Sequence, residues 1–172
     1  MPQQHRNHSS QRVANGAKST SHPARTHADQ LYRAATECVR QRERYARLVA
    51  SGVDEAEQQS ALRVACLCDE ILLDSVRAYE KAGGTEASQS SEEWWHKANS
   101  LWHACREYQR HHHNCDEKSK RLSARNPEAL KELAMEYDLE ASALLALRLA
   151  LATYQKVCPD CDIEQRRQTF VA

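Results

Sequence analysis

Apolar residues recur at helical spacing along most of the chain, starting near residue 29. They fall into four segments, over about residues 28–50, 54–82, 90–122 and 126–157, and each follows the 3.6-residue period of a helix. Short connections between long helices make sequential helices antiparallel neighbours. The pattern therefore predicts an all-α fold, an antiparallel up-down-up-down four-helix bundle.

Residues that start or stop helices stand at the ends of these segments. The starting signals are Asp54 with Glu57, Ser90 with Glu93, and Asn126 with Pro127, and the stopping signals are Gly52 and the pair Gly83-Gly84. The apolar stripes between these signals predict the core. Its expected members are Leu31, Ala35, Cys38, Tyr45 and Leu48, then Ala61, Val64, Cys68, Ile71, Leu72, Val76 and Tyr79, then Trp94, Ala98, Leu101, Cys105 and Tyr108.

The composition fits one helical domain with polar ends. The 172 residues include only four Gly and four Pro, which disfavours turn-rich sandwiches and barrels. We predict a disordered tail at 1–28, the bundle at 29–161 and a C-terminal tail at 162–172. The net charge is zero, so the basic footprint of a nucleic-acid-binding protein is absent, and nucleic acid is not an expected partner.

The predicted tail at 1–28 carries four basic residues, several His and no acid. A flexible basic arm could contact an anionic partner, but a solvated tail without a task and a cleaved organellar presequence fit the composition too. The tail lacks the apolar stretch of a secretory signal, and no segment of the chain reaches the roughly 18 apolar residues of a membrane span. The expected compartment is the cytoplasm, where thiols stay free, bind metal or react.

Three of the seven cysteines, Cys38, Cys68 and Cys105, lie near the midpoints of three predicted helices and on their inward stripes. Antiparallel helices bring their midpoints to one level, so the three thiols are expected to meet. Thiols that meet in a core can bind Cu(I) or Zn, or they can fill space as small apolar residues. Cys66 lies about 200° around the helix from Cys68 and cannot face the same ion.

Cys158 and Cys161 form a C-x-x-C pair at the end of the fourth predicted helix. The spacing suits half of a zinc site, and His27 or His96 at the same end of the bundle could complete it. The C-terminal end of a helix disfavours a thiolate, which argues against thioredoxin-like redox catalysis. A disulfide staple and two free thiols stay open as alternatives.

A second candidate site lies in the third helix, where His111 and Cys115 are four residues apart. Residues at that spacing share a helix face, so the two can bind one metal ion, and His112 with Cys115 can do the same. A solvated histidine run near a helix end is the alternative.

Cysteines on the inward stripes of a four-helix bundle resemble the core of the cytosolic copper-storage proteins. The residues that carry this resemblance are Cys38, Cys68 and Cys105, and the repeated C-x-x-x-C pairs of that family are absent. Glu93 and His96 match the E-x-x-H of di-iron bundles, which need a second such motif and two more inward Glu. The second and fourth predicted helices contain no His, so a di-iron, ferritin-like enzyme is disfavoured.

The fourth predicted helix is apolar on most of its circumference between residues 139 and 152. A bundle helix needs one apolar stripe, so a second face, with Leu139, Ala143, Ala146 and Ala150, needs a cover. We expect a homodimer through this helix. Cover by the first or third helix within a tight bundle, or by another protein, stays open as an alternative.

The sequence thus predicts a non-enzymatic helical bundle that binds a soft metal ion, copper or zinc, through Cys and His. The alternative is an interaction or assembly module in which the cysteines only pack.

Overall fold

The computed structural model describes residues 23–86, 92–122, 126–159 and 161. These residues form four helices, α1 (Pro23–Ser51), α2 (Glu55–Lys81), α3 (Glu93–Lys120) and α4 (Pro127–Val157), with no strand among them. The predicted all-α, four-helix class is therefore confirmed.

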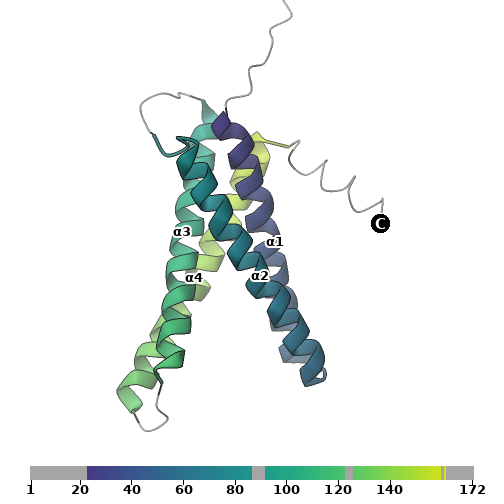
Figure 1. Cartoon of the computed structure of the whole chain (residues 1–172), viewed down its shortest axis with the longest axis vertical. Coiled ribbons are helices and arrows are strands. Elements are labelled where there is room, and N and C mark those ends of the chain that lie inside the picture. Colours follow the sequence, from purple (N-terminus) through teal and green to yellow (C-terminus); the bar gives the residue numbers. More distant parts are fainter. Residues whose placement is uncertain (1–22, 87–91, 123–125, 160, 162–172) are drawn as a thin grey trace, which may run out of the picture.

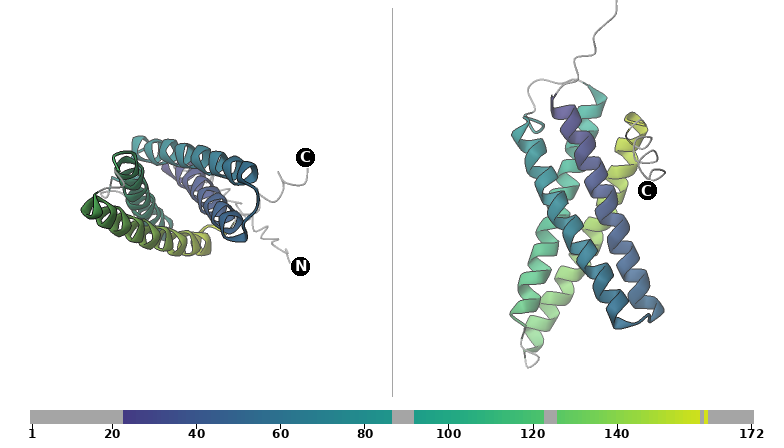
Figure 2. Two further views of the ribbon diagram at one scale, coloured as in Figure 1. Left: turned by 90° about the horizontal axis from the view of Figure 1, so that it is seen from below. Right: turned by 45° about the vertical axis from the view of Figure 1, so that its right-hand side comes forward.

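The four helices form two hairpins that diverge from a common end (Figure 1). α1 packs mainly on α2, and α3 packs mainly on α4. The hairpins meet where α1 begins and α4 ends, and they separate toward the opposite end, as both side views show (Figures 1 and 2). The main buried cluster lies within 24–39, 68–79, 94–108 and 143–161, so it fills only the half of the molecule where the hairpins meet.

Side-chain caps fix the starts of two helices as the sequence predicts. The Asp54 carboxylate accepts the Glu57 N–H at 2.8 Å before α2, and the Asn126 side chain accepts the Ala129 N–H at 3.3 Å before α4. The predicted start at Ser90 lies outside the described residues, and Glu92 occupies the cap position of α3 without a side-chain cap bond.

α1 begins at Pro23, earlier than the sequence pattern indicates. The last residues of the predicted tail are therefore helical. Pro is favoured in the first turn of a helix, and the small Ala24 and Ala28 are fully buried against the other helices. The remainder of that tail, 1–22, and the predicted C-terminal tail, 162–172, lie outside the described residues.

Two predicted core residues of α2 are exposed: Val64 by 37% and Ile71 by 56%. α2 packs mainly against one helix, and a two-helix contact covers only a narrow stripe. That stripe contains Ala61, Ala65, Cys68, Leu72, Val76 and Tyr79. Tyr45 and Leu48 of α1 are half-buried, because they lie beyond the core, where the hairpins diverge.

The four residues predicted to form a second apolar face of α4 do not share one environment in the structure. Ala143 and Ala150 are buried in the chain's own core, which is why they need no partner, whereas Leu139 and Ala146 are exposed. None of the described helices combines the length and the apolar content that crossing a membrane requires.

Among the three glycines that the structure describes, Gly84 alone lies close against a core side chain. A Cβ added there would lie 2.3 Å from Cε2 of Tyr79, a fully buried ring. We expect Gly84→Ala to lower the free energy of unfolding by about 3 kcal/mol, since the ring cannot move without repacking the core. Urea unfolding measures the change.

Gly52→Ala is the matched control, because a Cβ at Gly52 meets nothing within 4 Å. Its φ of 67° still makes alanine unfavourable, by about 1 kcal/mol. Equal losses in the two variants would contradict the close packing of Gly84 on Tyr79.

Candidate metal centre

The start of α1 and the end of α4 bring together one carboxylate and two thiols. The ligand atoms of Asp29, Cys158 and Cys161 all lie within 4.8 Å of one another, and no other group of three or more His, Cys, Asp or Glu in the described part of the chain is so arranged. Cys158 is the residue directly after α4, and the Cys161 N–H donates to its carbonyl at 3.3 Å. This turn gathers both cysteines at Asp29.

Hydrogen bonds fix the Asp29 carboxylate in place. Its Oδ1 accepts the Tyr154 hydroxyl at 2.7 Å and the Cys161 thiol at 2.9 Å. The Tyr154 ring lies against Tyr32, with 5.5 Å between the ring centroids. A carboxylate held by a buried phenol keeps its orientation whether or not an ion is bound, which is the usual role of groups around metal ligands.

Burial is the main cause that raises the pKa of the Cys161 thiol well above its ordinary range, and the bond to Asp29 adds to it. Burial and Asp29 likewise raise the pKa of Tyr154. The C-terminal end of a helix is also expected to raise the pKa of a thiol, although burial is the larger cause here. A raised pKa disfavours the thiolate form that redox catalysis needs.

The residue that lies with Cys158 and Cys161 is Asp29, and not His27 or His96 as the sequence predicts. His27 Nδ1 lies 2.9 Å from Gln30 Oε1, and His96 is an exposed residue stacked edge-on against Trp95. The available signal for Asp29 was topological: antiparallel α1 and α4 place the start of one beside the end of the other.

The three mid-helix thiols are buried, as predicted. Cys38 and Cys105 are fully enclosed and Cys68 is 7% exposed, whereas Cys66 lies on an exposed face. Cys38 Sγ donates to Asp69 Oδ1 at 3.1 Å. The three do not form a ligand group of the kind found at Asp29, and their metal binding stays a prediction.

A polar network lies where the hairpins begin to diverge, and all four helices contribute to it. The Asp69 carboxylate of α2 accepts hydrogen bonds from the Cys38 thiol and the Arg42 guanidinium of α1. It also accepts one from the Tyr108 hydroxyl of α3 at 3.2 Å. Arg42 Nη2 lies 2.7 Å from His112 Nε2. This network closes the apolar core on its open side.

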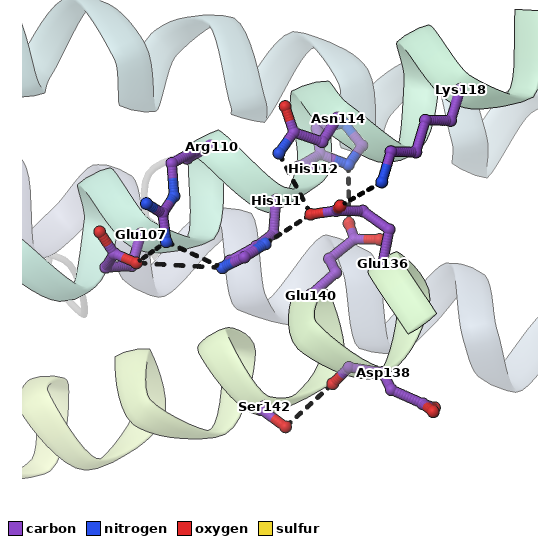
Figure 3. A network of polar contacts seen from close by, with 10 residues as sticks. All are labelled: Glu107, Arg110, His111, His112, Asn114, Lys118, Glu136, Asp138, Glu140 and Ser142. Atoms are coloured by element: carbon purple, nitrogen blue, oxygen red, sulfur yellow. Dashed lines mark hydrogen bonds and ion pairs between the residues drawn. The ribbon is translucent and has the colours of Figure 1, made fainter. Parts of the chain in front are cut away.

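In the second predicted metal site, His111 and Cys115 each interact with a different glutamate of α4. His111 Nδ1 lies 2.6 Å from Glu136 Oε1 (Figure 3), whereas the carboxylate that acts on the Cys115 thiol is that of Glu140. Burial and the Glu140 carboxylate raise the pKa of Cys115 to about 12. His112 Nδ1 lies 2.7 Å from Glu140 Oε1, so it also pairs with α4. Metal binding by His111 and Cys115 stays a prediction.

Glu136 is a buried carboxylate that joins α4 to three side chains of α3 (Figure 3). Lys118 donates to it at 2.8 Å, and Asn114 at 3.2 Å. The bond from Lys118, followed by that from His111, lowers the pKa of Glu136 to about 2. The charged form of Glu136 therefore stabilises the contact between α3 and α4.

We expect Glu136→Gln to lower the free energy of unfolding by about 1 kcal/mol at pH 7, since Lys118 loses its charged partner. Because the pKa of Glu136 in the fold is below the ordinary 4.5, its stabilisation is complete above that value and is lost as the pH falls toward 2. The difference in the free energy of unfolding between wild type and variant, measured with guanidinium, should therefore shrink as the pH falls from 4.5 toward 2.

Asp138→Asn is the control, because the Asp138 carboxylate points away from α3 (Figure 3). It should change stability little at either pH. A difference between wild type and Glu136→Gln that is constant from pH 7 to pH 3 would contradict the ionic role of Glu136.

Comparison of the chain with models of protein families, with curated proteins and with solved structures finds no match.

Proposed function

We propose that the protein binds a Zn²⁺ ion through Asp29, Cys158 and Cys161. The observation that supports this is the approach of their three ligand atoms to within 4.8 Å at a buried place in the fold. Two thiolates and a carboxylate are all ligands that zinc accepts. Cu(I) favours sulfur, so the carboxylate makes zinc the better candidate of the two metals that the sequence indicates.

The proposed role of the ion is structural and non-enzymatic. Cys158 and Cys161 expose 3% and 5% of their surface, which leaves little access for a substrate. The ligands belong to the first helix and to the turn after the last one, so the ion would tie the two hairpins together at the end where they pack. A structural zinc site has four ligands, so a fourth donor besides these three residues would complete the tetrahedron.

We assign the mid-helix thiols to packing. Cys105 has no exposed surface, and Cys38 and Cys68 are buried too. Unlike Cys158 and Cys161, these three thiols belong to no group of three close ligand atoms in the described part of the chain. Buried neutral thiols fill space as small apolar side chains do.

Assembly is a second proposed function, because large apolar side chains are exposed, most of them on two of the described helices. They include Val64, Leu67 and Ile71 of α2, and Met135, Leu139, Leu145 and Leu149 of α4. Exposed apolar residues in such number favour a contact with a partner. A homodimer is the simplest form of this function.

Zinc titration of the full chain, purified without a metal-affinity step, tests the metal site. We expect one equivalent to bind, as measured by competition with a chromophoric chelator. Replacing Cys158 and Cys161 together by Ser should remove that equivalent. Asp29→Asn should weaken the affinity by roughly tenfold or more, because it removes the ligand charge.

Cys66→Ser is the matched control, since Cys66 is exposed on α2 and should not affect binding. Thermal unfolding of each zinc-free variant checks that it folds. If one equivalent survives in the Cys158/Cys161 double variant and disappears when Cys38, Cys68 and Cys105 become Ala, the site is mid-bundle and the proposal is wrong.

A further inference from the structure

We infer that α4 pairs with α4 of a second copy of the chain, antiparallel, along a seam of six residues. The seam consists of Met135, Leu139, Ser142, Ala146, Leu149 and Thr153. This inference rests on the assembly function proposed above and is independent of the metal site.

The seam has the spacing of a coiled coil. Its members are separated by four, three, four, three and four residues, the heptad pattern in which a and d positions face a partner helix. None of the six is charged. Met135 is 58% exposed, Leu139 48% and Leu149 68%.

Most of this seam is uncovered in the single chain: five of its residues are exposed, and Thr153 is half-buried. The residues that α4 buries against its own chain form a different stripe, namely Leu133, Glu136, Ala143, Leu147, Ala150 and Tyr154. Viewed along the long axis, α4 runs along the rim, with no described helix on its outer side (Figure 2, left).

The two hydroxyl residues of the seam are already satisfied. Ser142 Oγ donates to the Asp138 carbonyl at 2.9 Å, on the side of α4 that faces away from α3 (Figure 3), and Thr153 Oγ1 donates to the Ala150 carbonyl at 2.8 Å. A partner helix can therefore cover both residues without leaving a hydroxyl group unpaired.

The seam complements itself when two copies run in opposite directions. With the two-fold axis midway between Ser142 and Ala146, Leu139 lies opposite Leu149, and Met135 lies opposite Thr153. These are the a-to-d layers of an antiparallel coiled coil, and the small central residues allow close approach.

Charge selects this orientation. The same register places Glu132 of one copy opposite Lys156 of the other, at both ends of the seam, and both residues are exposed. In a parallel pair, the two Glu132 side chains would instead lie side by side, and so would the two Lys156 side chains, so that like charges would face each other. Complementary charges at both ends therefore favour a second, antiparallel chain as the occupant.

Sedimentation equilibrium of the full chain at micromolar concentration tests the seam. The wild type should show twice the chain mass of 19.6 kDa. Leu139→Glu with Leu149→Glu should give a folded monomer, because both side chains are exposed in the single chain and buried only in the pair. Leu67→Glu on α2, where Leu67 is 58% exposed, is the matched control and should stay dimeric.

Charge reversal tests the orientation. Glu132→Lys alone and Lys156→Glu alone should each weaken the dimer by roughly fivefold or more, since each places like charges opposite one another twice. The double variant Glu132→Lys, Lys156→Glu should restore the wild-type dissociation constant. A double variant no tighter than the single ones overturns the antiparallel register.

Two outcomes separate the seam from the wider assembly function. A dimer that survives the Leu139/Leu149 substitutions and is lost with Leu67→Glu overturns the seam, while self-assembly through α2 stands. A wild type that is monomeric throughout overturns the seam and self-assembly together.

Discussion

Burial of one apolar cluster, at the end where the two helical hairpins meet, is the interaction on which the rest of the structure depends. Within each hairpin the helices pack on one another, whereas the hairpins contact each other mainly through this cluster and through polar contacts such as that of Tyr108 with Asp69. Small residues such as Ala24, Ala28 and Ala98 are fully buried there and permit close approach of the backbones. The Asp69 network marks the edge of the cluster, and beyond it the hairpins separate.

This geometry explains where the two proposed activities lie. At the closed end, the first and last helices are near enough for Asp29 to reach the cysteines that follow α4. Along the outer side of α4, the intramolecular contact uses one stripe and leaves the seam uncovered. An ion at the closed end would reinforce the contact between hairpins, while a second copy on α4 would cover the surface that this contact leaves exposed.

The helices themselves could be predicted from the sequence, because periodicity and caps such as Asp54 and Asn126 are local signals. The divergence of the hairpins could not, since apolar spacing shows that a stripe is buried without showing which helix buries it, and Ile71 was misassigned for that reason. The C-x-x-C pair was recognisable because its spacing is local. Asp29 was missed because it lies 132 residues from Cys161 in the chain.

X-ray absorption at the zinc edge, on the full chain loaded with one equivalent, tests the proposed metal centre most directly. We expect two sulfur ligands at about 2.3 Å and oxygen ligands at about 2.0–2.2 Å, from Asp29 and a further donor. A shell of three or four sulfurs, without a carboxylate oxygen, would place the ion among other cysteines and would overturn the proposed site.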